Sequence, residues 1–330
     1  MKTTIFRKSF TILELVVVMT ITGVMIGSTF QMFMNIYQSY SYLYEMNSLD
    51  FELSNASMKI VRYLENRAYD SVIDSNDTNF TVLSSNYILD KNSTLQWVGK
   101  ALDTYNGTWN SSKSRVIPNW SGFLDLTKNH NTTTLYTDSN SSRSGIFEFD
   151  TDISQAEDII FNLSDGDVNI SKSGSNFLPA IFFRGGTSND RGCFGWEESI
   201  LGDTNSSECA FIGHFEANSS DNIFKSKDQV NGFGNNVKDL KIYEQYLFSW
   251  TAYGLKVEYS NTTKSRNLYF YYNYRPWNGD NMEDNGTRTI LLRNVTKFKY
   301  SSNGSTLILE ICIKDKNSNE IVFCRESIVY

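Results

Sequence analysis

The chain has 330 residues, of which 40% are hydrophobic and 20% are charged, and its formal net charge is −7 at pH 7. A protein this acidic is poorly suited to binding nucleic acid directly, because contacts to phosphate need clustered Lys and Arg. The two histidines, His130 and His214, stand in no metal-ligand or triad spacing. We therefore expect neither an enzyme nor a protein that needs a cofactor.

Residues 1–9 form a short cationic segment that contains Lys2, Arg7 and Lys8 and no acid. Such a segment is expected to remain in the cytoplasm. An apolar run follows, and after Glu14 the next charged side chain is Glu45, about thirty residues later, which is long enough to cross a bilayer. The sequence therefore predicts a single membrane span near the N-terminus.

Glu14 lies near the start of this span, where a carboxylate is costly to bury and is by default a functional residue. An ordinary secretory signal ends its apolar run with a small-residue cleavage site. Here the small residue, Ser9, precedes the apolar run. A cut after Ser9 would therefore leave the membrane segment on the mature protein.

The string KSFTILELVVVMTITGVMIG resembles the class III leader and N-terminal helix of type IV prepilins and type II secretion pseudopilins. The resemblance implies that a prepilin peptidase cuts between Ser9 and Phe10 and methylates the new amino group of Phe10. The family usually has Gly before the cut, where this chain has Ser9. Glu14 then occupies the fifth mature position, whose glutamate is credited in the family with recruiting subunits during assembly.

The resemblance also implies the partners and the location. The partners would be the prepilin peptidase, other major and minor pilins or pseudopilins, the inner-membrane assembly platform and membrane lipid. The protein would cross the inner membrane once, with its head in the periplasm, before it enters a pilus or pseudopilus. The large head favours a minor subunit that primes or caps the filament, similar to the W-class minor pilins or the J-class pseudopilins. The alternative is an uncut, single-pass membrane-anchored periplasmic enzyme or an adhesin-like binding protein.

After the membrane segment, residues 10–34, the sequence predicts an amphipathic continuation of the same helix over residues 35–72. Its apolar positions recur at steps of three and four: Met46, Leu49, Leu53, Ala56, Ile60 and Leu64. One helix from Phe10 to about Tyr69 would be ~90 Å long. Four tyrosines lie between its halves, either at the membrane interface or packed under the head: Tyr37, Tyr40, Tyr42 and Tyr44.

Residues 73–330 are expected to form one β-rich, pilin-like head that packs on the amphipathic half of the helix, which gives an α+β fold. Leu255, Val257 and Tyr259 alternate with mostly polar residues, as in a strand with one buried face. The segment from Leu307 to Ile313 is apolar at nearly every position, which suits a strand buried on both faces. Asn- and Gly-rich turns separate these runs, so we expect an antiparallel meander.

Cys312 and Cys324 flank the turn at residues 317–319 symmetrically, which predicts that they lie opposite each other on two strands and form a disulfide. Cys193 and Cys209 would then close a second loop. Such bonds persist in oxidising compartments. The alternative is four reduced, buried thiols.

The acidic loop that contains Asp280, Glu283 and Asp284 could gather a calcium ion, but its spacing fails the EF-hand pattern. Met282 stands at one ligand position, and Leu291 stands where a bidentate Glu is needed. We therefore expect a solvated loop and assign no metal site.

Overall fold

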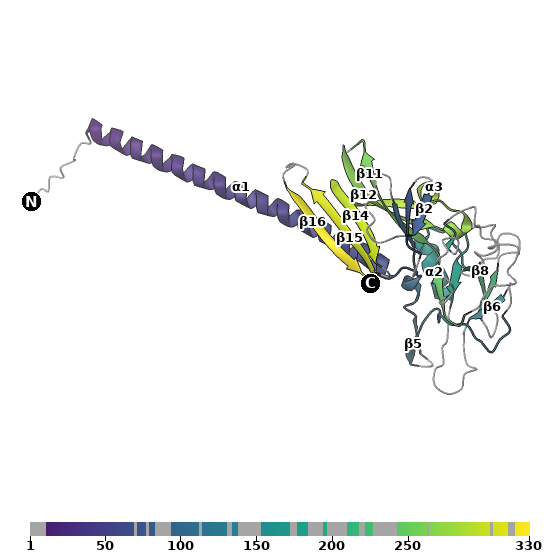
Figure 1. The fold of residues 1–330 in the computed structure, drawn as a ribbon. Helices are drawn as coiled ribbons and strands as arrows, with labels where there is room; N and C mark the ends of the chain where they lie inside the picture. Colours follow the sequence, from purple (N-terminus) through teal and green to yellow (C-terminus); the bar gives the residue numbers. More distant parts are fainter. Residues whose placement is uncertain are drawn as a thin grey trace, which may run out of the picture.

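The computed structural model describes residues 11–68, 71–76, 79–82, 94–111, 114–130, 134–137, 153–171, 177–183, 194–196, 210–217, 222–226, 243–262, 264–303, 306–315 and 321–330. Figure 1 shows a long helix, α1 (Ile12–Glu65), that projects from a head built mainly of antiparallel strands. The α+β class expected from the sequence is therefore confirmed.

Helix α1 runs through 54 residues without interruption, from the N-cap Thr11 to the C-cap Asn66. At the usual rise this is ~80 Å. Its first four-fifths are largely exposed, whereas its last turns bury the stripe Leu53, Ala56, Ser57, Ile60 and Leu64. The three- and four-residue steps in the sequence correctly predicted the face that packs on the head.

A six-stranded antiparallel sheet, in the order β13-β12-β11-β3-β1-β2, forms the centre of the head. Its strands are β1 (Ile73–Asn76), β2 (Asn79–Val82), β3 (Thr94–Val98), β11 (Ala252–Ser260), β12 (Ser265–Tyr274) and β13 (Thr287–Leu292). Strand β3 lies between β1 and β11, with Leu95 opposite Leu255, and all five of its residues are buried. The first and last thirds of the chain are therefore joined through β3.

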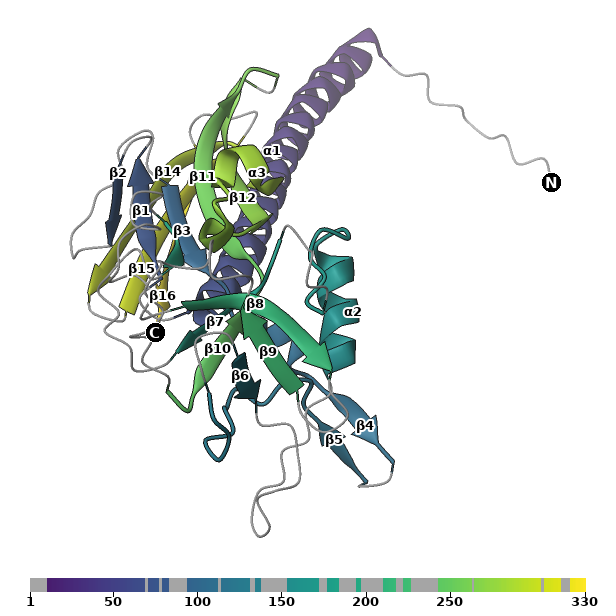
Figure 2. The same ribbon diagram turned by 90° about the vertical axis from the view of Figure 1, so that its right-hand side faces the viewer.

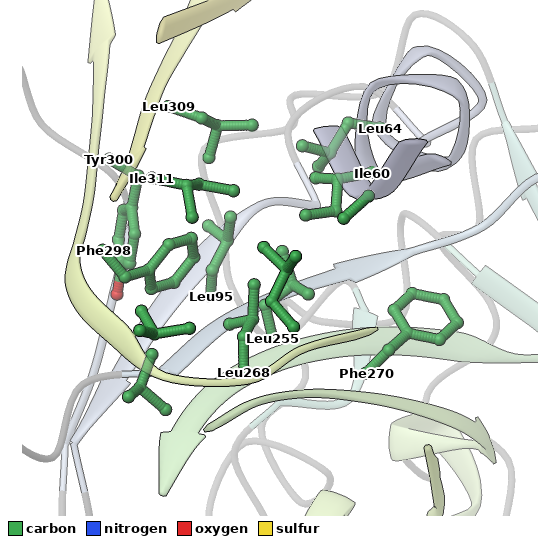
Figure 3. Close-up of a cluster of buried hydrophobic side chains, with 14 of the residues drawn as sticks. Ile60, Leu64, Leu95, Leu255, Leu268, Phe270, Phe298, Tyr300, Leu309 and Ile311 are labelled. Atoms are coloured by element: carbon green, nitrogen blue, oxygen red, sulfur yellow. The ribbon is translucent and has the colours of Figure 1, made fainter. Parts of the chain in front are cut away.

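A separate three-stranded sheet is formed by β14 (Val295–Asn303), β15 (Thr306–Lys314) and β16 (Val322–Val329), with β15 in the middle. Its inner face, the six-stranded sheet and the last turns of α1 share one core, in which Figure 3 labels Ile60, Leu64, Leu95, Leu255, Leu268, Phe270, Phe298, Tyr300, Leu309 and Ile311. Each fully buried aliphatic side chain contributes about 1.5–3 kcal/mol. Tyr300 also donates a hydrogen bond to the buried carboxylate of Asp74, which links the two sheets.

The structure corrects two expectations about these strands. Strand β15 is not buried on both faces: Leu309 and Ile311 lie in the core, whereas Ile308 and Glu310 are half-buried on the other face. The reason is that α1 and the six-stranded sheet cover only the inner face. The alternation in β11 ends at Val257, because Tyr259 is exposed near the end of the β11–β12 hairpin. The predicted meander is also divided between two sheets.

A five-stranded sheet, in the order β10-β7-β8-β9-β6, lies at the end of the head farther from the free end of α1 (Figure 1). Its strands are β6 (Thr134–Thr137), β7 (Ala180–Phe183), β8 (Ala210–Ala217), β9 (Asn222–Ser226) and β10 (Tyr246–Ser249). Helix α2 (Ile153–Leu163) packs here through Ile153, Ala156 and Ile160. Helix α2 was not expected from the sequence, although these three positions have helical spacing.

The remaining elements are short: η1 (Leu102–Thr104), the hairpin β4 (Thr108–Asn110) and β5 (Arg115–Ile117), η5 (Pro276–Asn278) and α3 (Met282–Asn285). The last two connect β12 to β13 and carry the acidic loop considered below.

Candidate functional site

The start of α1 is a capping box formed by Thr11 and Glu14. Glu14 Oε2 accepts hydrogen bonds from the Thr11 backbone nitrogen and from Thr11 Oγ1, both at 3.0 Å, and the Glu14 backbone nitrogen donates to Thr11 Oγ1 at 3.4 Å. These bonds satisfy groups that a helix start leaves unpaired. Glu14 is therefore held at the first turn of the helix by its own neighbour.

From the sequence we predict a role in assembly for Glu14 and none for Thr11. The pattern Thr-x-x-Glu before an apolar run is the sequence signal for a capping box and could have identified the partner. Ser9 and Phe10, the two residues of the predicted cleavage site, lie outside the described residues. Cleavage and methylation therefore remain predictions.

Helix α1 is the one helix of the described residues that is long and apolar enough to span a membrane. None of the residues in its apolar part is buried against the part of the head that the structure describes. About 20 residues suffice to cross the hydrocarbon core, so a span that begins near Glu14 ends near Phe33. More than half of α1 therefore continues past the bilayer-length segment.

From the end of the bilayer-length segment onward, large apolar side chains recur at every seventh position: Phe30, Tyr37, Tyr44, Phe51 and Met58. Each is between 60% and 70% exposed. We call these five residues the heptad row. Phe33 and Tyr40, each 67% exposed, extend it at the intermediate positions. A sustained seven-residue repeat is the pattern of a helix that packs along a second helix.

The heptad row faces away from the head. Leu53 and Ile60, which pack into the head core, each follow a row residue by two positions, or about 200° around the helix. The tyrosines between the two halves of α1 are likewise exposed, so the alternative that they pack under the head is wrong for this chain alone. Apolar surface of this extent in water marks an interaction face.

Cys312 and Cys324 lie directly opposite each other on β15 and β16 and form the predicted disulfide, with an S–S distance of 2.07 Å. Cys312 and Cys324 are therefore not reduced thiols, which was the alternative expectation from the sequence. Glu310 is the one carboxylate whose ligand atoms group with them among the described residues. Cys193 and Cys209 lie outside the described residues, so their pairing stays a prediction.

Loss of the Cys312–Cys324 disulfide is expected to destabilise the head. The bond closes a sequence separation of 12 residues, for which chain entropy predicts about 2–4 kcal/mol. Cys312→Ser should therefore lower the free energy of unfolding by that amount under oxidising conditions, measured by urea denaturation. Equal stability of the native protein with and without reductant would contradict this expectation.

The acidic loop between β12 and β13 does not gather its carboxylates around one point. Asp280 Oδ2 accepts hydrogen bonds from the Arg275 backbone nitrogen at 2.8 Å and from Arg275 Nε at 2.9 Å. Glu283 pairs with Lys256 on β11. The expectation of a solvated loop is thus wrong for Asp280, whose side chain is only 7% exposed. Two of the three carboxylates are bound to cations of the chain itself.

The two histidines lie in different parts of the head, and each contacts its own neighbours. His130 Nδ1 accepts a hydrogen bond from the Tyr136 backbone nitrogen at 3.2 Å, so Nε2 carries the proton and donates to the Asp125 carbonyl oxygen at 2.8 Å. Burial lowers the pKa of His130. His214 is buried on β8 and lies 3.4 Å from Glu216. The two rings belong to separate contacts and form no common catalytic group.

The geometry defines a class of protein: a bilayer-length apolar helix continues without a break into a β-rich head and carries an exposed heptad row between them. No protein-family model, curated protein or solved structure matches this chain.

Proposed function

We propose that this chain is a structural subunit of the type IV prepilin class, a minor pilin or pseudopilin that primes or caps a filament. In this proposal the head is pilin-like, the leader is removed before Phe10, and α1 holds the subunit in the inner membrane until assembly. The observation that carries the proposal is the heptad row, because it extends past the bilayer-length segment and faces away from the head. A helix that only anchored an enzyme would need no such face in water.

The row and the apolar segment together support a function in filament assembly. In the membrane, lipid covers the apolar part of α1, and Tyr37 and Tyr40 lie just past the hydrocarbon core, at the interface that aromatic rings favour. Farther along, Tyr44, Phe51 and Met58 remain exposed. Packing against the helix of another pilin or pseudopilin would cover the exposed face of α1 along its whole length. The subunit performs no chemistry itself; its partners are the prepilin peptidase, the assembly platform and other subunits.

Mass spectrometry of the mature amino terminus tests the proposal directly. The protein would be purified from cells with and without their prepilin peptidase. N-methylated Phe10 that appears only with the peptidase would establish the class. An intact Met1, or a cut elsewhere, would reject it and favour the membrane-anchored enzyme or adhesin-like protein.

Glu14 offers a second test, because its two roles can be separated. Glu14→Ala removes both the capping box and the charge, whereas Glu14→Gln retains a side chain that can complete the capping box. If the charge sets the axial register with a neighbouring amino terminus, both variants should be processed normally but incorporated poorly into filaments. Incorporation would be measured by immunoblotting of sheared filaments.

Normal incorporation of Glu14→Gln together with a defect in Glu14→Ala would assign Glu14 to helix capping and contradict the register role. A Thr11→Val variant serves as the matched control. It removes the hydroxyl of the capping box and leaves the carboxylate charge in place.

A further inference from the structure

The triplet Asn-x-Ser/Thr, in which x is not Pro, occurs 17 times in the chain. It is the acceptor sequence for N-linked oligosaccharides on proteins outside the cytoplasm. Asn, Ser and Thr are abundant here, so the triplet alone has little weight. The residue two positions before the Asn carries a further signal. It is Asp or Glu in eight of the triplets and Lys or Arg in none.

Composition does not account for this charge. Asp and Glu make up 37 of the 330 residues, so about two of the 17 triplets would have an acid at this position by chance. We call the motif Asp/Glu-x-Asn-x-Ser/Thr the acidic sequon, and its acceptors are Asn76, Asn79, Asn92, Asn140, Asn169, Asn205, Asn218 and Asn285. A carboxylate at a fixed distance from the acceptor gives an enzyme a charged group to bind in addition to the hydroxyl. The repeated acid therefore indicates recognition by a transferase.

The acidic sequon of Asn285 lies on the surface of the head. It joins the end of α3 to the start of β13, and Figure 2 shows α3 in front of β12, with α1 behind. The side chains of Glu283, Asp284, Asn285 and Thr287 are exposed. The acid, the acceptor amide and the hydroxyl are therefore all open to an enzyme in the folded protein.

The hydrogen bonds of Asn285 leave its amide nitrogen available. Asn285 Oδ1 accepts a hydrogen bond from the Asn281 backbone nitrogen at 2.9 Å, whereas Nδ2 has no partner among the described residues. An oligosaccharide attaches to Nδ2 and keeps the carbonyl oxygen, so the modified side chain can still accept this bond. Glu283 pairs with Lys256, but the glutamate side chain is 48% exposed. Its carboxylate therefore remains accessible as well.

Two other acidic sequons are less accessible in the folded head. In the sequon of Asn76, the acid is Asp74, which is only 2% exposed. In the sequon of Asn169, the Ser171 hydroxyl donates a hydrogen bond to Glu157 at 2.7 Å. Each therefore lacks one of the groups that a transferase would bind, and the sequon of Asn285 lacks none.

We propose that Asn285 is a site of N-glycosylation, modified by a transferase that recognises the acid two residues before it. The donor would be an oligosaccharide linked to a polyisoprenyl diphosphate. Asn285 Nδ2 forms a bond to C1 of the first sugar and loses one proton, and the polyisoprenyl diphosphate leaves with the electron pair of the broken C1–O bond. The inference rests on one part of the proposed function, the position of the head outside the cytoplasm.

One tryptic peptide isolates this site. Trypsin releases residues 267–288 together, because Arg275 is followed by Pro276, and this peptide contains no other sequon. The full-length protein would be purified from the cells that make it, and the peptide would be analysed by fragmentation in a mass spectrometer. We expect a covalent oligosaccharide on Asn285, which Asn285→Gln should remove.

The role of the acid is tested by two further variants. Glu283→Gln should lower the occupancy of Asn285 about tenfold, as expected for loss of one charged hydrogen bond to the enzyme. Glu283→Asp keeps the charge and should be modified nearly as well as the native chain. The proposal is overturned if Asn285 carries no oligosaccharide, or if Glu283→Gln is modified as fully as the native chain.

The sequon of Asn261 is the matched control. Asn261 and Thr262 are exposed at the β11–β12 hairpin, but Tyr259 stands at the position of the acid. Asn261 should be unmodified in the native chain, and Tyr259→Asp should make it an acceptor. Equal occupancy of Asn261 with and without the new acid would contradict recognition of the acid.

The same purified protein separates this proposal from the proposed function. Methylated Phe10 together with an unmodified Asn285 would overturn the glycosylation proposal alone. An intact Met1 together with a glycosylated Asn285 would support glycosylation and reject the prepilin class, because a membrane-anchored enzyme or adhesin would also present its head outside the cytoplasm.

Discussion

Replacing Asp280 by Ala is expected to lower the free energy of unfolding by about 3–5 kcal/mol, the cost of leaving a buried charge without its partner. The Arg275 side chain is 1% exposed and that of Asp280 is 7% exposed. Burial lowers the pKa of the Arg275 guanidinium, and the neighbouring carboxylates of Asp280 and Asp167 oppose that effect. The pair is therefore far more costly to break than an ion pair in solvent.

Arg275 also binds groups from distant parts of the chain, so the loss should extend beyond the loop. Its Nη1 donates to Asn273 Oδ1 at 2.9 Å, and its guanidinium lies 4.2 Å from the centre of the Phe177 ring. Asn273 in turn donates to the Ser164 carbonyl oxygen at 3.0 Å and to Asp167 Oδ2 at 3.1 Å. Through these contacts the end of β12 is joined to the segment that follows α2.

The same loop supplies the control. Glu283 pairs with Lys256, but its side chain is 48% exposed, so Glu283→Gln should cost no more than about 1 kcal/mol. Both variants would be compared by urea denaturation at equal salt concentration. Equal destabilisation by the two substitutions would show that burial does not determine how much the Arg275–Asp280 pair contributes to the free energy of unfolding.

The elements that the sequence predicted well are those with one unambiguous period. The buried stripe of α1 has helical steps over several turns, and no proline interrupts it, so its inward face was predictable. Its end was not: the helix stops at Glu65 and Arg67 already bridges to Gly99, whereas the sequence predicted a continuation to residue 72. The pairing of Cys312 with Cys324 followed from their symmetry about a turn, and the register of β15 and β16 confirms it. Local pattern alone was sufficient in these cases.

Strand β3 shows why other elements were missed. It lies in the middle of the sheet and is buried on both faces, yet it contains Thr94 and Gln96. Gln96 is satisfied by distant partners: it donates to Ser75 Oγ at 2.6 Å and accepts from the Tyr274 hydroxyl at 2.9 Å. Polar residues with partners far away in sequence hide the apolar pattern of a buried strand, because those partners are known only from the fold.

The candidate site was predictable only where its residues follow a local sequence pattern. The apolar span and Glu14 follow from local composition, and the capping partner Thr11 was within reach of a known pattern. The role of Asp280 was not, because its carboxylate is buried only once Arg275, Asn273 and Phe177 come together. From sequence alone, a loop with several acidic residues is expected to be solvated, because a buried cation beside it is known only from the fold.

The heptad row leads to the other large expected effect: Phe51→Lys should block incorporation into filaments and leave the head folded. Phe51 is 70% exposed and lies outside the bilayer-length segment, on the face opposite the head. A lysine there would place a charge in the middle of the proposed helix–helix contact, where burying it without a partner is costly. Because the side chain packs on nothing in the described head, the free energy of unfolding should change by no more than about 0.5 kcal/mol.

Glu52→Lys is the matched control, since it introduces the same side chain one residue later, about 100° around the helix and outside the row. Filament incorporation would be measured for both variants in cells, with membrane levels of each protein measured in parallel. Poor incorporation of Phe51→Lys with normal membrane levels, and normal incorporation of Glu52→Lys, would identify the row as the assembly face. If Phe51→Lys assembles as well as the native chain, the row does not contact another subunit, and the proposed function loses the observation that carries it.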